Sequence, residues 1–411
     1  MFKDHAEITI IGGGIIGTAM AYYLAKEGRD VSLVEKRFLA SEASGANGGG
    51  SGGYGAGLHV DLEKYRFSQI RELGRQLYSK LSDELGLDIE YRHSGGLTLI
   101  RPREMEVFQK IYDSYIDAGL NVKLLSPPEA RRIEPELKGD IGGAVFASDR
   151  VHINPYRIVQ GYGETARSRY NVKLYTNTAV TGIRLNKDRV EAVETDRGTI
   201  STKIVINAAG AWSSRIGAMA GCEVPIIPRR GQVFVTQAVP KRLNYFIGIV
   251  EATIARTNLE TMEMQDTPDR PTIVDGQVQY RNLYGRQTAG GQILFGGRSE
   301  MVGLNKQVTR QGLSSIMSHV LEFFPGFEDM LVVRTWAGSM PYTPDGKPIL
   351  GPAPGVEGFY LATGLCGGGL GTGAVLGRLM TNLINHGERP GLFDDTSITR
   401  FSKNTLESSA P

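Results

Sequence analysis

Three clusters of glycine in this 411-residue chain have the residue type and spacing to hold a charged or flat ligand. They lie at residues 12–17, 45–57 and 364–373. A residue without a side chain lets a ligand approach the backbone closely, and backbone N–H groups in glycine-rich turns bind anions. We therefore expect the chemistry of the chain at these three places.

A strand, a glycine turn, a helix and a second strand are expected in this order near the N-terminus. The apolar run at 7–11 predicts a buried strand, and the pattern after it predicts a helix over 15–26. A second strand at 31–34 ends on Glu35, about 20 residues beyond the turn. This order is typical of a βαβ unit that binds a dinucleotide.

Each residue type in this unit has a physical reason. Gly12 permits the tight turn, Gly14 lets a pyrophosphate approach the backbone, and Gly17 lets the helix pack closely on the sheet. The N-terminus of the helix then faces the negative charge. Glu35 can accept hydrogen bonds from ribose hydroxyls and would repel a 2′-phosphate, which disfavours NADP. The unit alone leaves both FAD and NAD open.

Composition and charge exclude several classes of protein. The net charge is +2 without a long basic run, so no charge argument favours nucleic acid or an anionic membrane surface. No stretch of about 18 uninterrupted apolar residues predicts a membrane span. Cys222 and Cys366 are too few for a disulfide framework, and neither they nor the six histidines have metal-ligand spacing. We expect a reduced, cytoplasmic protein without a metal.

Further motifs point to a flavin. Residues 36–50 are too rich in glycine for a helix or a strand, and the predicted strand at 203–213 ends on small residues. Near the C-terminus, the segments 334–351 and 358–371 precede a helix that runs to about residue 385. In these motifs the chain resembles the D-amino-acid oxidase superfamily of FAD enzymes, in the branch with glycine oxidase, sarcosine oxidase and the amine-dehydrogenase subunits of proline, opine and cyanide-forming complexes. The resemblance spans nearly the whole chain.

The resemblance implies an α/β fold with two discontinuous domains. A Rossmann-type, glutathione-reductase-like FAD-binding domain is expected over 1–85, 148–225 and 330–400. A substrate-binding domain with a mixed β-sheet is expected over 86–147 and 226–329. Alternating patterns predict strands of this sheet near 95–101, 231–237 and 292–297.

The resemblance also implies which residues hold noncovalent FAD. The first glycine cluster would bind the pyrophosphate, Glu35 and Lys36 the adenosine end, and the last cluster the isoalloxazine ring, where a helix start near Leu370 points its positive end at the ring. The residues assigned in this way are Gly12, Gly14, Ile15, Ile16, Gly17, Glu35, Lys36, Ala43, Ser44, Asn47, Gly48, Gly49, Val180, Ala209, Gly210, Trp212, Gly338, Gly364, Cys366, Gly367, Gly368, Gly369 and Leu370. We expect the thiol of Cys366 to be a small buried filler.

The substrate side departs from the family pattern. Family members that act on simple amino acids place an arginine against the substrate carboxylate, and the glycine oxidase pattern has it just after a Trp-Ala-Gly segment. Here residues 336–338 are followed by Ser339 and Met340. The sarcosine oxidase pattern has its arginine just after the loop that lines the flavin. In this chain residues 51–55 of that region contain no arginine, and the only candidate beyond them is His59. The candidates that remain near the substrate are Met340, His59, Arg281, Arg286 and Arg298.

The expected activity is oxidation of a C–N bond in an amino acid or secondary amine, such as an imino acid, an opine or an N-alkyl amino acid. Hydride passes to flavin N5 and leaves an imine that water hydrolyses. Oxygen, a quinone or a partner subunit of a hetero-oligomer could accept the electrons. Oxidation of an α-hydroxy acid or polyol phosphate, and a flavin-containing assembly subunit without its own substrate, stay open. An NAD-only dehydrogenase would leave the last glycine cluster unexplained.

Overall fold

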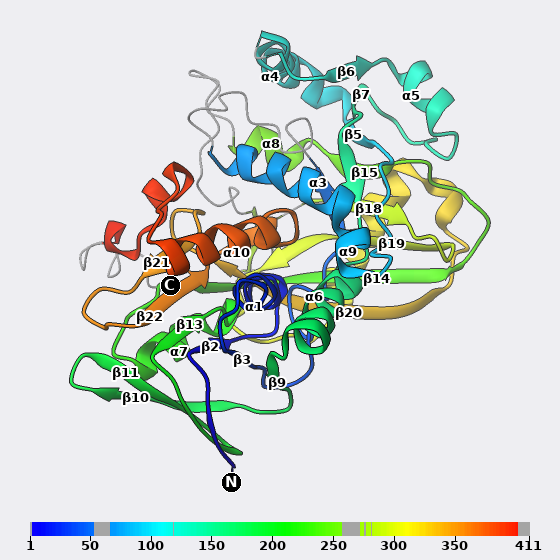
Figure 1. Cartoon of the computed structure of the whole chain (residues 1–411). Helices are drawn as coiled ribbons and strands as arrows, with labels where there is room; N and C mark the ends of the chain where they lie inside the picture. The colour runs from blue at the N-terminus through cyan, green and yellow to red at the C-terminus, as the bar shows by residue number, and fades with distance from the viewer. Residues whose placement is uncertain are drawn as a thin grey trace.

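The N-terminal βαβ unit is part of a mainly parallel sheet (Figure 1). The computed structural model describes residues 2–52, 66–117, 119–256, 272–274, 277–280 and 282–401. Six of the described strands form this sheet, in the order β21 (Ile349–Pro352), β22 (Phe359–Thr363), β13 (Ile204–Asn207), β2 (Ile8–Ile11), β3 (Val31–Val34) and β9 (Lys173–Tyr175). Neighbours are parallel except β21 and β22. Such sheets are covered on both faces, and β2 and β3 are accordingly buried at every residue.

Helices that pack closely on one another position two of the glycine clusters. They are α1 (Ile15–Lys26), α3 (Arg66–Leu85), α6 (Pro155–Tyr170) and α10 (Gly369–His386). In Figure 1, α1 and α10 lie side by side, and α6 and α3 pack against them. A Cβ at Gly377 of α10 would lie 3.0 Å from the Cβ of Ala19, so only a residue this small permits the close approach. The N-termini of α1 and α10 thereby come to the same place.

A smaller sheet covers the other side of the parallel sheet. Its strands, in order, are β1 (Phe2–His5), β12 (Gly198–Ser201), β11 (Arg189–Thr195) and β10 (Val180–Asn186). Together with α7 (Ser213–Met219) it encloses a core that includes Ile183, Val193, Val205 and Phe359. This sheet places the first residue of β10, Val180, beside the end of β3.

The second large sheet is mixed and contains ten of the described strands. Its main path is β16 (Thr272–Val274), β17 (Gln277–Tyr280), β19 (Gln292–Glu300), β18 (Tyr284–Gln287), β15 (Phe246–Ile249), β5 (Gly96–Ile100), β7 (Gly143–Ala147) and β6 (Val122–Leu125). From β19, the long strand β14 (Ile227–Ala238) branches off and pairs with β20 (Val332–Tyr342). The helices of this part are α4 (Met105–Asp117), α5 (Pro127–Ile133), α8 (Glu251–Arg256) and α9 (Arg310–Phe323).

The α/β fold with a mixed second sheet is confirmed. The strands predicted near 95–101, 231–237 and 292–297 are β5, β14 and β19. The predicted domain boundaries stay a proposal. One strand within the third segment expected for the FAD-binding domain, β20, pairs along its length with β14 of the mixed sheet. The chain therefore stays in the mixed sheet up to residue 342 and enters the parallel sheet only at β21.

A short strand pair links the end of segment 43–50, which we call the flavin loop, to β8 (Arg150–His152), a strand that contacts β15 of the mixed sheet. Strand β4 (Gly50–Gly52), within the second glycine cluster, pairs with β8. Short 3-10 helices are η1 (Pro102–Glu104), η2 (Gly210–Trp212), η3 (Pro325–Phe327), η4 (Cys366–Gly368), η5 (Gly391–Thr396) and η6 (Ile398–Arg400). Among the described residues, no helix has both the length and the apolarity needed to cross a bilayer, and no group of His, Cys, Asp or Glu is placed to hold a metal ion.

Candidate active site

A cavity of about 710 Å³ is lined by residues of both large sheets and brings the three glycine clusters together. This volume is within the usual range for sites that hold a cofactor or substrate. Of the residues predicted to bind the cofactor, all line this cavity except Gly17 and Gly364. Their individual roles stay predictions, but the chain does place them around one space.

The glycine turn after β2 has a shape that only glycine allows. Gly12 has a φ of +120°, and a Cβ there would lie 2.3 Å from the carbonyl oxygen of Ala208. Gly17 lies beneath the turn, where a Cβ would lie 2.0 Å from the carbonyl oxygen of Gly12. Gly14 is the N-cap of α1, in an extended conformation without a side-chain hydrogen bond. The turn therefore presents bare backbone and a helix N-terminus to the cavity, which fits a pyrophosphate.

Glu35 and Lys36 lie at the end of β3, where the adenosine half of a dinucleotide would bind. The Glu35 carboxylate accepts hydrogen bonds of 2.9 Å from the backbone N–H of Gly13 and of Arg37, which fix its position at the cavity wall. The Lys36 ammonium lies 3.2 Å from the ring centroid of Trp212. Burial lowers the pKa of Lys36, while Glu42 and Glu35 oppose this shift. The side chains assigned to the adenosine end thus form one connected group.

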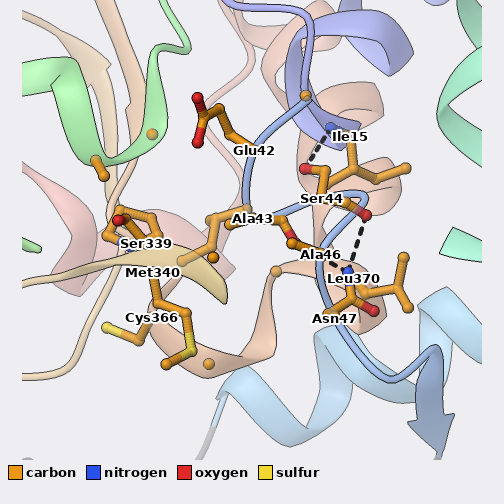
Figure 2. Close-up of a pocket in the computed structure, with 18 of the residues that line it drawn as sticks. Ile15, Glu42, Ala43, Ser44, Ala46, Asn47, Ser339, Met340, Cys366 and Leu370 are labelled. Atoms are coloured by element: carbon orange, nitrogen blue, oxygen red, sulfur yellow. Dashed lines mark hydrogen bonds between the residues drawn. The ribbon is translucent and has the colours of Figure 1, made fainter. Parts of the chain in front are cut away.

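The flavin loop is ordered by its own side chains (Figure 2). The hydroxyl of Ser44 accepts a hydrogen bond of 3.0 Å from the backbone N–H of Ile15 at the start of α1. The Asn47 amide donates to the carbonyl oxygens of Ala43 and Ser44 and accepts from the backbone N–H of Gly49. These contacts hold the loop against the N-terminus of α1, which places two of the predicted binding segments in contact.

Aromatic residues of the mixed sheet press against the glycines of this loop. A Cβ at Gly48 would lie 2.4 Å from the ring of Tyr284, and one at Gly50 would lie 2.4 Å from the ring of Phe246. The two rings are nearly parallel, at 13°, with centroids 6.5 Å apart. Both rings line the cavity. They could not be predicted from the sequence, because the alternation of a strand does not show which ring contacts a loop more than 190 residues away.

Arg286 is a structural residue and not a cation of the cavity wall. Its Nε donates a hydrogen bond of 2.6 Å to the carbonyl oxygen of Gly48, and its Nη2 lies 3.5 Å from that of Ile153. Burial lowers its pKa to about 10. The guanidinium therefore links β18 of the mixed sheet to the flavin loop at Gly48.

The last glycine cluster closes the cavity at the start of α10. Cys366 has a φ of +48°, and its sulfur lies 3.2 and 3.4 Å from the carbonyl oxygens of Gly346 and Gly364, either of which can accept its one S–H. The residue is half-buried and lines the cavity, which does not agree with the expectation of a small buried filler. The hydroxyl of Tyr78 donates to the carbonyl oxygen of Leu370 and anchors the first turn of α10. The turn thus directs a helix N-terminus at the cavity.

The residues predicted to lie near the substrate are not all found at the cavity. Met340 lines the cavity (Figure 2). Arg298 also lines it, but its Nη2 lies 3.1 Å from the Glu300 carboxylate in a buried ion pair. His59 and Arg281 lie outside the described residues. A further cation that the sequence analysis did not name, Arg229, lines the cavity from β14.

Acid is expected to destabilise the protein through His152 on β8. Burial, with Arg286 and Arg92 nearby, lowers the pKa of His152 to about 3 from an ordinary value of 6.5. Between these values the unfolded chain takes up a proton that the folded chain does not, so stability falls as the pH falls through this window. When the pH is lowered from about 7 to about 4.5, the melting temperature of His152→Asn should fall by less than that of the wild type.

The measurement is the melting temperature at both pH values, followed with released flavin fluorescence because β8 pairs with β4 of the flavin loop. The exposed residue His5 provides a control, since His5→Asn should retain the acid sensitivity of the wild type. An equal fall for His152→Asn and the wild type would contradict this prediction.

Comparisons with known proteins agree with this arrangement. The family model described as DAO, FAD dependent oxidoreductase, matches residues 7–383. Hydrogen cyanide synthase subunit HcnC of Pseudomonas protegens is 28% identical over 94% of this chain and 94% of its own. Dimethylglycine dehydrogenase of Rattus norvegicus is 28% identical over 98% of this chain, which spans about half the length, 45%, of that protein. The crystal structure of L-proline dehydrogenase from P. horikoshii superposes with a TM-score of 0.78 at 25% identity, covering 95% of this chain and 96% of that one.

Proposed function

This chain belongs to the DAO family of FAD-dependent oxidoreductases, and from that premise we propose that it oxidises the C–N bond of an amino acid or an N-substituted amino acid. The observation that carries the proposal is the charge of the cavity wall. Arg71, Arg150 and Arg229 line it on the side of the mixed sheet and α3, whereas Glu300 balances the charge of Arg298. Among the described residues of the lining, the acidic ones are Glu35 and Glu42, which lie with the cofactor residues. A substrate with a carboxylate complements this wall.

The residues fit FAD on structural grounds. A Cβ at Gly12 would collide with the backbone of Ala208, and one at Gly48 or Gly50 would collide with an aromatic ring, so both turns present only backbone to the cavity. When bound there, FAD would supply the acceptor for the hydride that leaves the carbon next to the substrate nitrogen. The N-terminus of α10 lines the same cavity and would favour negative charge on a ring that is bound beside it.

The side chains of the wall orient the substrate and exclude water. Phe246 and Tyr284 form a flat apolar surface, and burial raises the pKa of Tyr284, so its hydroxyl stays protonated. Positive charge on the wall lowers the pKa of a substrate amine, which favours the neutral amine that can be oxidised. The chain therefore needs to position its substrate more than to move protons.

Product analysis tests the proposal. FAD-loaded protein is incubated with glycine, sarcosine, dimethylglycine, both enantiomers of proline and an opine, with oxygen or a dichlorophenolindophenol dye as acceptor. We expect an oxo acid or aldehyde, trapped as its dinitrophenylhydrazone, from at least one of these amines. Glycolate and lactate serve as matched compounds without nitrogen. Product from these hydroxy acids but from none of the amines would contradict the proposal.

The acceptor distinguishes two forms of the proposed enzyme. The relative HcnC is named as a subunit of a synthase, which supports a dehydrogenase that passes electrons to a partner subunit. Turnover with the dye but not with oxygen would agree with this form. Hydrogen peroxide formed in step with the product would identify an oxidase instead.

A further inference from the structure

The carboxylate of Glu42 lies at a part of the cavity wall where an anion would bind. Glu42 lines the cavity and directly precedes the flavin loop, two residues before Ser44 (Figure 2). The hydroxyl of Ser44 accepts the hydrogen bond from the backbone N–H of Ile15, at the N-terminus of α1 that fits a pyrophosphate. An unbalanced carboxylate at this place would repel a pyrophosphate, since charges within about 10 Å of each other still interact at about 0.1 M salt.

Two lysines from separate parts of the chain balance Glu42. The ammonium of Lys306 lies 2.7 Å from one carboxylate oxygen of Glu42, and that of Lys36 lies 3.6 Å from the other. Lys36 follows β3 of the parallel sheet, whereas Lys306 lies between β19 of the mixed sheet and α9. The side chains of Lys306 and Glu42 are only 28% and 17% exposed, so salt screens this pair less than a surface pair.

The indole ring of Trp212 joins the same group. Its centroid lies 3.2 Å from the ammonium of Lys36 and 5.9 Å from that of Lys306. Trp212 lines the cavity together with Lys36 and Glu42. Attraction between each ammonium and the face of the ring helps to hold both lysines beside Glu42.

The segment that carries Lys306 is fixed to the mixed sheet. The carbonyl oxygen of Gln307 accepts a hydrogen bond of 2.7 Å from the guanidinium of Arg230 on β14. Two residues further on, the backbone N–H of Thr309 donates to the side-chain oxygen of Gln232, also on β14, at 2.8 Å. Strand β14 thereby sets the position of Lys306.

The other acid that lines the described part of the cavity is stabilised differently. The carboxylate of Glu35 accepts hydrogen bonds from the backbone N–H groups of Gly13 and Arg37. The carboxylate of Glu42 is held instead by the two lysines. Loss of Lys306 would therefore leave this part of the wall with a net negative charge.

We propose that Lys306 is a positioning residue for FAD, because it neutralises Glu42 and so lets the cavity wall accept the pyrophosphate. Lys306 acts through Glu42 and needs no contact of its own with the cofactor. Since its position is set by the mixed sheet, this sheet contributes to the retention of a cofactor whose phosphates face the parallel sheet. The inference concerns binding of FAD and is independent of which substrate the chain oxidises.

Equilibrium dialysis of the FAD-loaded protein against known FAD concentrations gives Kd and tests this role. The two partners of the ion pair should have opposite effects. Lys306→Met leaves Glu42 with too little positive charge and should raise Kd about 5- to 10-fold at low ionic strength. Glu42→Gln removes the repulsion and should lower Kd about 3-fold or more, and the double variant should stay within about 3-fold of the wild type.

Salt and a matched lysine provide the controls. At about 1 M salt, where the Debye length is about 3 Å, the differences between the variants should shrink. Lys306→Arg keeps the charge and should have the Kd of the wild type. Lys123 forms an exposed ion pair of 3.9 Å with Glu129, so Lys123→Met should leave Kd unchanged. The melting temperature is measured for every variant.

An ion pair that only supports the fold would give a different pattern, in which Lys306→Met and Glu42→Gln both raise Kd. That pattern would overturn the proposal. It would also be overturned by a folded Lys306→Met protein with the Kd of the wild type, or by a double variant that binds FAD as weakly as Lys306→Met. If Lys306→Met does not fold, Glu42→Gln decides alone, because tighter binding supports the proposal and unchanged or weaker binding overturns it.

Discussion

Replacing Gly12 with alanine is expected to yield protein that purifies almost without FAD. The backbone φ of +120° disfavours any side chain, and the added Cβ would lie 2.3 Å from the carbonyl oxygen of Ala208, just after β13. The turn must move to relieve this contact, and the backbone that would bind the pyrophosphate moves with it. Strain of about 1–3 kcal/mol at the turn corresponds to a loss of about 5- to 150-fold in FAD affinity.

The ratio of flavin to protein absorbance, and titration of the apoprotein with FAD, measure this effect. Gly28 offers a matched control, because its φ is also positive, at +86°, but a Cβ there would meet nothing within 4 Å. Gly28→Ala should therefore cost about 1 kcal/mol of stability and retain FAD. A Gly12→Ala protein with full FAD content and wild-type affinity would show that this turn does not hold the cofactor.

Replacing Arg286 with methionine is expected to loosen the flavin loop. The variant loses the hydrogen bond of 2.6 Å to the carbonyl oxygen of Gly48 and leaves that buried oxygen without its donor. The cost is about 1–3 kcal/mol, which in a chain of this size lowers the melting temperature by several degrees. FAD affinity should fall about 10-fold because the displaced loop is part of the binding surface. Thermal denaturation and FAD titration measure both effects.

Arg167→Met is the control for Arg286→Met, since Arg167 forms an exposed ion pair with Glu164 and such pairs contribute little. The control should leave the melting temperature and the FAD affinity unchanged. An Arg286→Met protein that keeps both wild-type values would show that the bond to Gly48 does not hold the loop.

The cofactor side of the site could be predicted from the sequence because its geometry is local. The turn at Gly12, the helix that starts at Ile15 and the acid at Glu35 lie within one βαβ unit, where spacing determines position. The last glycine cluster was also predictable, because a glycine turn before a helix presents backbone wherever it occurs. These segments meet in space because α1 and α10 pack together.

The substrate side could not be predicted in the same way. Arg229 and Met340 are more than 100 residues apart, and only the register of β14 with β20 makes them neighbours. A shift of one residue would turn Arg229 to the face occupied by Glu300. Arg286 shows the reverse case, since nothing in its local sequence indicates that it binds the carbonyl oxygen of Gly48. Pairing between distant strands decides which arginine borders the cavity and which supports the loop.

The proposed oxidation of an amine is tested most directly by an anaerobic titration of the FAD-loaded protein, in which the visible absorption of the flavin is recorded. The titrants are amines and matched compounds without nitrogen, such as proline with tetrahydrofuran-2-carboxylate and glycine or sarcosine with glycolate. If the enzyme oxidises C–N bonds, at least one amine bleaches the flavin band while its matched compound does not. Bleaching by dithionite or by a hydroxy acid, but by none of the amines, would contradict the proposed oxidation.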